Sequence, residues 1–257
     1  MLPGSSSSSL PARPTRYSRL CSVGGSSAGD VLRLRNRSLS LSVGQAQPRS
    51  FHVGIDFSVT ATILLIRHAA HVELGRVLSG RRREVALSKE GLEQAEIVAD
   101  LLGVEPLAAV YSSPRERAYY TAREIADAHE LKVSIADGLD EVDFGGWTGM
   151  SFDALEGEPD WHGWNEARGT ARPPGGESMA EAATRAVETL AMIAGEHPDQ
   201  KVAAVSHCDV IRGVIAHLLG LPLDNLLRFD VDPASVSRIA IGTWGARVIS
   251  INERLYQ

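Results

Sequence analysis

Arginine and histidine residues follow three apolar segments of the chain. Arg67 and His68 come directly after the run TILLI, and His207 comes directly after VAAVS. Two more arginines, Arg115 and Arg117, come shortly after the run AAVYS. Guanidinium groups bind phosphate oxygens through paired hydrogen bonds, and a neutral imidazole is a competent nucleophile toward phosphorus. If the fold brings these side chains together, they could bind a phosphate and accept its phosphoryl group.

Such a transfer also needs a proton for the departing alkoxide. The segment LDEVDFGGWTG, residues 139–149, offers Asp140, Glu141 and Asp143 beside glycines that allow close approach of a substrate. Arginines close to a histidine lower its pKa and keep it unprotonated, and they neutralise a phosphoryl group without a metal. We therefore expect neither a metal nor a cofactor. Spacing alone does not choose among the three carboxylates, nor between Arg115 and Arg117.

The segments that must position these side chains alternate between strand and helix patterns. Short continuous apolar runs are typical of strands that are buried on both faces. They predict strands at residues 62–66, 108–112, 132–135, 202–206, 237–241 and 246–251. This alternation indicates an α/β fold, which we expect to be a three-layer α/β/α sandwich with a mainly parallel central sheet. Ligands bind beyond the carboxyl ends of such strands, where Arg67, His68 and His207 lie.

Two amphipathic segments are predicted to form helices against this sheet. One apolar stripe, in residues 89–102, consists of Leu92, Ala95, Val98 and Leu102. A second stripe, in residues 179–194, consists of Met179, Ala183, Ala186, Leu190 and Ile193. The Ser-x-x-Glu pattern of a capping box occurs at Ser113–Glu116 and at Ser178–Glu181. A helix that begins at Pro114 would point further N–H donors toward the phosphate.

Composition narrows the class of protein. The 257 residues carry a formal net charge of −6, so nucleic acid is not an expected partner. Two cysteines, Cys21 and Cys208, lie in dissimilar segments and imply no disulfide framework, which fits a reducing compartment. No run approaches the roughly 18 apolar residues of a membrane span. We expect a protein of the cytoplasm with a small phosphorylated substrate.

Residues 1–58 differ from the rest of the chain. They are rich in Ser, Arg, Pro and Gly and show no sustained period of strand or helix. We expect them to be a disordered extension before a catalytic domain at residues 59–257. Two origins stay open for this extension: an upstream stretch translated from a wrongly chosen start codon, or an organelle transit peptide, which would change the location.

Five ordered motifs make the chain similar to a known family. LLIRHA, SSPRERAYYTA, LDEVDFGGWTG, PPGGES and VSHCDVIR resemble the histidine phosphatase superfamily, also called the phosphoglycerate mutase-like family. By this resemblance His68, preceded by Arg67, is the phosphate-accepting histidine, and Arg117 rather than Arg115 is the second phosphate-binding arginine. The resemblance also makes Glu141 the acid and His207 the second histidine of the pocket.

The chain departs from the family pattern at several positions. Ala69 replaces the usual glycine of Arg-His-Gly, and His71 and Leu74 replace a threonine and an asparagine. The missing polar side chains remove expected phosphate contacts, one of which His71 could supply. Cys208 replaces the glycine after the second histidine. Only 35 residues separate Glu141 from Glu177, too few for the lid of a mutase, and this favours water as the phosphoryl acceptor.

The sequence thus predicts a metal-independent phosphatase that hydrolyses a phosphomonoester through phosphohistidine. Phosphate would be bound by Arg67, Arg117 and His207, and catalysis would use His68, Glu141 and His207. The alternatives are a phosphoglycerate mutase and a non-catalytic phosphate-binding regulator. A metal site made of His68, His71, His207 and Asp209 conflicts with the neighbouring arginines.

Two groups of residues keep alternative interpretations. Arg76 and Arg81–Arg83 either form a solvated basic loop or contact distal anionic groups of the substrate. Trp147, Trp161 and Trp164 either pack in the core or wall the substrate cavity.

Overall fold

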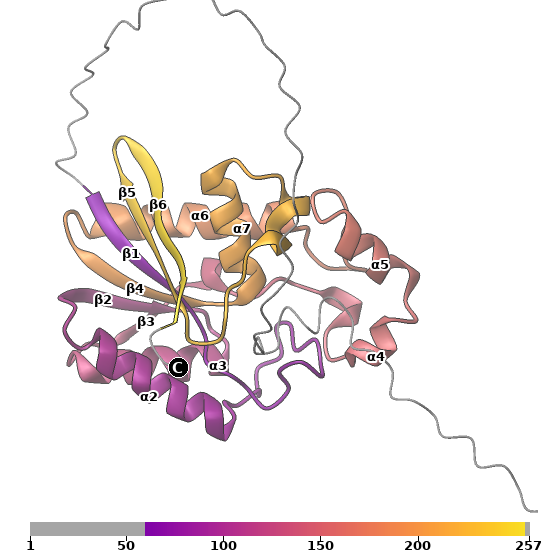
Figure 1. Cartoon of the computed structure of the whole chain (residues 1–257), viewed down its shortest axis with the longest axis horizontal. Helices are drawn as coiled ribbons and strands as arrows, with labels where there is room; N and C mark the ends of the chain where they lie inside the picture. Colours follow the sequence, from indigo (N-terminus) through magenta and orange to yellow (C-terminus); the bar gives the residue numbers. More distant parts are fainter. Residues whose placement is uncertain (1–59, 255–257) are drawn as a thin grey trace, which may run out of the picture.

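A computed structural model describes residues 60–254, and its centre is one six-stranded sheet (Figure 1). The strands lie in the order β3-β2-β4-β1-β5-β6. Their bounds are β1 Thr60–Arg67, β2 Leu107–Ser112, β3 Val133–Ile135, β4 Lys201–Ser206, β5 Val236–Gly242 and β6 Gly245–Glu253. Each of the six predicted strands is present, and each begins and ends within two residues of its predicted bounds.

The sheet is mainly parallel. Strands β1 to β4 pair in parallel, whereas β5 is antiparallel to both of its neighbours, β1 and β6. Five strands of the described chain therefore run in one direction and β5 runs in the other. The carboxyl ends of β1, β2 and β4, which carry the candidate site residues, meet at one edge.

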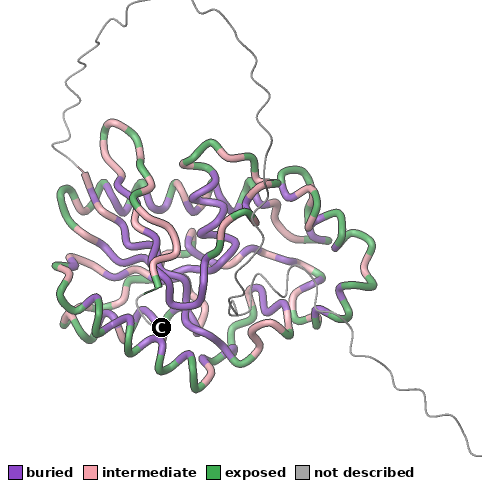
Figure 2. Tube along the Cα trace, viewed as in Figure 1, coloured by how far each residue is buried: buried purple, intermediate pink, exposed green. Residues whose placement is uncertain are grey.

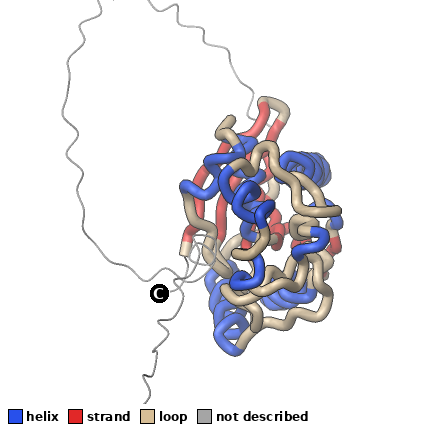
Figure 3. The backbone as a smooth tube through the Cα atoms, turned by 90° about the vertical axis from the view of Figure 1, so that its right-hand side faces the viewer, coloured by secondary structure: helices blue, strands red, loops and turns tan. Residues whose placement is uncertain are grey.

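Helices cover both faces of the sheet. On one face lie α2 (Lys89–Leu102) and α3 (Glu116–Ala128), and on the other lie α6 (Met179–Glu196) and α7 (Cys208–Leu219). Short helices α4 (Phe152–Leu155) and α5 (Pro159–Glu166) lie in the connection between β3 and α6, and this loop-rich end faces the viewer in Figure 3. The predicted three-layer α/β/α sandwich is confirmed.

Strand β1 shows why continuous apolar runs were the right signal. Ile63 and Leu65 pack into one core cluster, and Leu64 and Ile66 pack into the cluster on the opposite face. Successive side chains of a strand point to opposite faces, so a strand between two helical layers needs apolar residues at every position. The buried centre of the sheet is visible in Figure 2.

Two local predictions are wrong. Helix α3 begins at Glu116 with Arg115 as its N-cap, so Ser113 caps no helix and the helix does not begin at Pro114. The side chain of Ser113 contacts His207 and Asp140 instead. Leu92 is 50% exposed and is not part of the buried stripe of α2.

The other helix predictions hold. Ala95, Val98 and Leu102 of α2 are buried, and so is the whole predicted stripe of α6. Ser178 and Glu181 form a complete capping box at the start of α6. The predicted disordered extension, residues 1–58, lies outside the described residues. No helix between residues 60 and 254 is long and apolar enough to cross a membrane.

Candidate active site

Two histidines lie side by side at the carboxyl edge of the sheet because β1 and β4 are neighbours. Arg67 at the end of β1 is in register with Ser206 at the end of β4. The backbone N–H of His68 donates to the carbonyl of Ser206 at 2.9 Å, which continues the ladder by one residue. The rings of His68 and His207 are consequently 5.1 Å apart, between their centroids.

The ring of His68 presents an unprotonated nitrogen. Its Nδ1 lies 2.8 Å from the carbonyl oxygen of Ala69, and because a carbonyl can only accept, Nδ1 carries the proton. Its Nε2 then carries the lone pair of the neutral ring, and this lone pair accepts a hydrogen bond from Arg117 Nε at 3.3 Å. Burial, followed by the charge of Arg117, lowers the pKa of His68 well below its usual value. The ring thus stays neutral, as a nucleophile toward phosphorus must.

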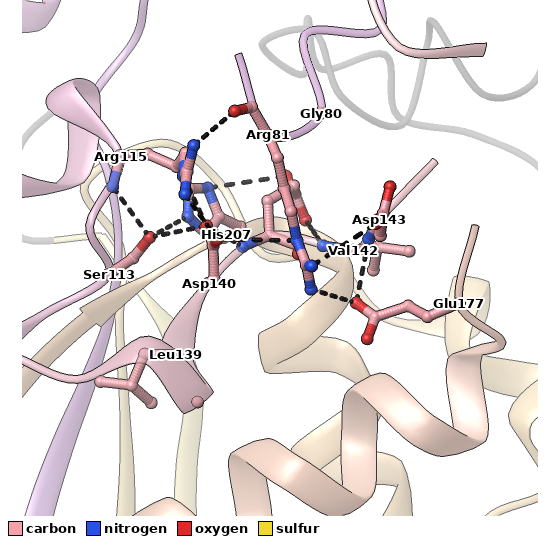
Figure 4. A network of polar contacts seen from close by, with 12 residues as sticks. Gly80, Arg81, Ser113, Arg115, Leu139, Asp140, Val142, Asp143, Glu177 and His207 are labelled. Atoms are coloured by element: carbon pink, nitrogen blue, oxygen red, sulfur yellow. Dashed lines mark hydrogen bonds and ion pairs between the residues drawn. The ribbon is translucent and has the colours of Figure 1, made fainter. Parts of the chain in front are cut away.

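Arg117 and Arg115 point to different places although they are two residues apart. Arg117 is 1% exposed and donates from Nη2 to the carbonyl of Gly80 at 2.8 Å and toward Nδ1 of His207 at 3.2 Å. Arg115 instead makes two hydrogen bonds of 2.8 Å to the two carboxylate oxygens of Asp140 (Figure 4). Arg115 therefore forms an ion pair with Asp140, whereas Arg117 faces His68.

Two guanidinium nitrogens at the site have no hydrogen-bond partner among residues 60–254. They are Nη1 of Arg117 and Nε of Arg67, both buried. Arg67 is held through Nη1, which donates to the carbonyl of Val231 at 2.7 Å. Buried donors are normally satisfied, so unpartnered N–H groups beside a nucleophile indicate the place of an anionic ligand.

Glu141 contacts the same cluster, whereas Asp143 does not. Oε2 of Glu141 lies 3.7 Å from Arg117 Nη2 and 3.5 Å from Nδ1 of His207, and Oε1 accepts from the backbone of Val142 at 2.9 Å. Burial raises the pKa of Glu141 to about 8, against the opposing charge of Arg117. Glu141 is therefore protonated at neutral pH, as a general acid must be. The side chain of Asp143 is 42% exposed and faces Arg81.

His207 lies behind the other four residues. It is fully buried, its Nε2 is 2.7 Å from the hydroxyl of Ser113, and its Nδ1 faces Arg117 and Glu141. It does not belong to the wall of the pocket over His68, to which Arg67, Arg117 and Glu141 do belong. Burial lowers the pKa of His207 well below its usual value, so the positive charge of the site comes from the arginines.

His71 completes the cluster of imidazoles. It lies in the pocket wall, with its ring 5.3 Å from that of His68. Its Nδ1 accepts the backbone N–H of Glu73 at 3.3 Å, so the proton of the neutral ring is on Nε2. Burial, with Arg117, lowers the pKa of His71 to about 3. His71 is therefore a neutral donor at the position where the family usually has threonine.

Loop packing explains the glycines of residues 139–149. A Cβ on Gly145 would lie 2.1 Å from the carbonyl oxygen of Pro174, and Gly145 has a φ of +51°. Glu177 accepts the backbone N–H of Asp143 at 2.9 Å, and its own N–H donates to the carbonyl of Asp143 at 2.9 Å. The motif PPGGES thus clamps the loop that carries Glu141, and Gly145 serves this contact between loops.

The tryptophans pack in the core. Trp147, Trp161 and Trp164 are each at most 2% exposed, and none lies in the wall of the pocket over His68. The ring centroids of Trp147 and Trp161 are 5.4 Å apart in an edge-to-face arrangement. Of the two interpretations of these residues, the structure supports packing.

Sequence reasoning missed two contributors to the site. Ser113 contacts His207, and its position at the end of β2 was a signal that the capping pattern concealed. The carbonyl of Gly80 orients Arg117, and no side chain in the sequence could have indicated it. Between residues 60 and 254, no three His, Cys, Asp or Glu side chains are arranged to hold a metal ion.

Comparison with known proteins gives the class. A family model of the histidine phosphatase superfamily (branch 1) matches residues 63–254, and the chain belongs to this superfamily. Phosphoserine phosphatase 1 of Hydrogenobacter thermophilus is 38% identical over 155 residues, which cover 60% of this chain and 74% of that protein. The prediction of a histidine phosphatase is confirmed at the level of family and enzyme class.

Two more proteins extend the comparison. The chain is 35% identical over 179 residues to the bifunctional protein Rv2228c of Mycobacterium tuberculosis, covering 68% of this chain but only 49% of that protein, about half its length. The solved structure of mycobacterial glucosyl-3-phosphoglycerate phosphatase matches with a TM-score of 0.69 and 26% identity, covering 76% of this chain and 100% of that one.

Proposed function

We propose that the protein hydrolyses a phosphomonoester in two steps, with His68 as the phosphoryl acceptor. Nε2 of His68 attacks phosphorus, the bond from phosphorus to the alcohol oxygen breaks, and Glu141 gives its proton to that oxygen. The phosphoryl group then resides on Nε2. Glu141, now a carboxylate, takes a proton from water, the water oxygen attacks phosphorus, and the bond to Nε2 breaks to release inorganic phosphate.

Arg67 and Arg117 have the electrostatic role in this proposal. Their unpartnered N–H groups, Nε of Arg67 and Nη1 of Arg117, would donate to oxygens of the transferring phosphoryl group. His207 would act on the phosphate through Arg117 and Glu141, which it holds in place from behind. The observation that carries the proposal is the unprotonated Nε2 of His68 beside the guanidinium of Arg117.

Trapping of the phosphoenzyme tests this assignment. The protein is mixed with labelled para-nitrophenyl phosphate and quenched in alkali, which preserves a phosphohistidine, and the modified residue is located by mass spectrometry. We expect label on His68, none in His68→Ala, and unchanged labelling in His217→Ala, a control at an exposed histidine of α7. Label on another residue, or turnover by His68→Ala, would contradict the proposal.

Mutase activity is the second candidate function. The connection between Glu141 and Glu177 argues against this activity. This connection is filled by α4, α5 and the tryptophan core, and it contributes only Phe152 to the pocket wall. Water should therefore be the acceptor. With 3-phosphoglycerate and its bisphosphate primer, any turnover should release inorganic phosphate. Fast interconversion of phosphoglycerates with little release would favour the mutase.

We also propose that residues 59–257 suffice for catalysis, because the family match spans residues 63–254. A chain that starts at Val59 should keep the kcat/KM of the full chain, and a large loss would overturn this domain assignment.

A further inference from the structure

Part of the wall of the pocket over His68 is apolar. Its wall includes the side chains of Leu74, Val77, Leu78, Phe152 and Cys208. A leaving group that lies against these side chains would meet hydrocarbon.

The cations of the wall all lie at the phosphate end. Arg67 and Arg117 are its only arginines, the wall contains no lysine, and both arginines flank His68. A phosphate that occupies their free N–H groups leaves no cation for a second anionic group of the substrate. Among residues 60–254, a second anion would need an arginine from outside this wall.

Three nearby arginines outside the wall, Arg81, Arg82 and Arg115, are paired with carboxylates. Arg81 donates to Glu177 at 2.9 Å and also faces Asp140 and Asp143, both at 3.6 Å. Arg82 forms an ion pair with Glu73 at 2.5 Å. Nε and Nη2 of Arg115 both donate to the carboxylate of Asp140, as Figure 4 shows. Contact of Arg81, Arg82 or Arg115 with a distal anionic group of a substrate would require breaking these pairs.

One fixed negative charge lies in the wall. Asp209 is 2% exposed, and its carboxylate is held by Arg168 at 2.9 Å and by Arg212 at 3.6 Å. These two arginines do not belong to the pocket wall, so a ligand meets the carboxylate of Asp209 before it meets them. The charge of Asp209 acts inside the pocket, since it contributes to the raised pKa of Glu141. It would repel a carboxylate or a second phosphate.

We propose that the substrate is a phosphomonoester whose phosphate is its only anionic group and whose alcohol part is apolar or carries a cation. The apolar part of the wall, the lack of a third arginine or lysine in it and the carboxylate of Asp209 act in the same direction. A carboxylate on the leaving group would lose its hydration on entry and find no partner. This inference rests on the proposed function, because it concerns the alcohol that the phosphatase releases.

Matched pairs of substrates test the inference on the unchanged full chain. Phosphoethanolamine and phosphoserine differ by one carboxylate, as do phenyl phosphate and 4-carboxyphenyl phosphate. We expect kcat/KM to be at least about tenfold higher for the member without a carboxylate in each pair, because binding of an uncompensated charge is discriminated strongly. Equal values, or a preference for phosphoserine or the carboxyphenyl ester, would overturn the inference.

A variant of the wall sharpens the test. Leu74→Arg places a cation in the apolar wall and should shift the ratio of kcat/KM toward the carboxylated member of each pair. Leu74→Gln, which changes polarity without charge, and Leu92→Arg, on the exposed surface of α2, should leave the ratio near that of the original chain. A shift as large in Leu74→Gln or Leu92→Arg as in Leu74→Arg would contradict a local effect of charge.

Failure of the inference and failure of the proposed function give different results. If the proposed function is wrong, none of the four esters is hydrolysed in a way that depends on His68. If only the inference is wrong, all are hydrolysed, the activity is lost in His68→Ala, and the carboxylate makes no difference.

Discussion

The arginines of the pocket and those of its rim differ in what they contact. Arg67 and Arg117 are at most 3% exposed, and each keeps one N–H group without a partner among the described residues. At the rim, Arg81 and Arg115 are paired with Asp140 and Glu177 (Figure 4). The same residue type is thus satisfied by carboxylates in one region and left ready for a ligand in the other.

On the proposed function, this difference separates arginines that hold the loop from arginines that bind the phosphate. Burial of a guanidinium without a carboxylate is unfavourable, and a protein retains it where an anion later supplies the missing partner. The rim pairs have another effect: they hold the loop with Glu141 in place and keep their own arginines away from the substrate. Each prediction below would break or sharpen this distinction.

Glu141 gives the largest expected effect that depends on the substrate. In Glu141→Gln, phosphorylation by an alkyl phosphate should slow by about 10²–10⁴-fold, because a basic alkoxide needs a proton to leave. Phosphorylation by para-nitrophenyl phosphate should suffer far less, since para-nitrophenolate leaves readily. Burst kinetics separate this step from the hydrolysis of phosphohistidine, in which Glu141 acts as the base. Equal losses on both esters, or a selective loss in Asp143→Asn, would mean that the acid is misassigned.

The arginines give the next largest effect. Arg117→Met should lower kcat/KM by about 10²–10³-fold, the range seen when one donor to a developing charge is removed. Arg115→Met should lower it by less than about tenfold, because Arg115 acts only through the position of the loop. Arg123→Met, at an exposed arginine of α3, is the control. Similar losses of kcat/KM in Arg115→Met and Arg117→Met would contradict the distinction between the arginines of the pocket and those of the rim.

The pH profile tests the protonation of Glu141. The acid must be protonated for the first step, and burial raises its pKa to about 8. For an alkyl phosphate, kcat/KM should therefore be level between pH 7 and about 8 and fall up to tenfold per unit above it, since only the protonated fraction reacts. Phosphate monoesters finish titrating near pH 6, below this window. Para-nitrophenyl phosphate should lack the decline, and a decline that begins near pH 5 would contradict the raised pKa.

Much of this molecule could be predicted because the signals are local. The continuous apolar runs predict all six strands, and the position of residues at strand ends predicts that His68 and His207 meet. Leu92 shows the limit. Helix α2 turns Gly91 and Gln94 inward instead, because Gly91 lies against the carbonyl of Ala70 and Gln94 accepts the N–H of Ala70 at 2.9 Å. A tertiary contact with the first loop thus overrides the pattern of apolar residues.

Sequence spacing could not decide between Arg115 and Arg117 for the same reason. Arg115 is bound by Asp140, a residue 25 positions away, and this pairing leaves Arg117 for His68. Ser113 fits the pattern of a helix cap, but its hydroxyl contacts His207, 94 positions away. Such roles depend on partners that are distant in sequence, and only the resemblance to a family, not the spacing, singled out Arg117 and Glu141.

In stability, the variants of Arg115 and Arg117 should rank in the reverse of their order in activity. Arg115 and Asp140 are 13% and 10% exposed as side chains and form a two-pronged ion pair, so Arg115→Met leaves a largely buried carboxylate short of a partner. Ser113, Arg81 and the N–H of Glu141 still contact Asp140. Because of this compensation, we expect the free energy of unfolding to fall by about 1–3 kcal/mol, less than for a fully buried pair.

Arg117→Met should behave differently although Arg117 is the more deeply buried arginine. Its nearest carboxyl group, Glu141, is protonated below about pH 8 and needs no counter-ion there, so removal of the guanidinium strands no charge. Methionine fills much of the same volume and brings no desolvation cost, which offsets the loss of a donor to the carbonyl of Gly80, and we expect the free energy of unfolding at pH 7 to change by less than about 1 kcal/mol. Urea unfolding measures which of the two variants loses more stability, with Arg123→Met as the control. If Arg117→Met loses more stability than Arg115→Met, the guanidinium of Arg117 is held by the fold rather than kept for a ligand.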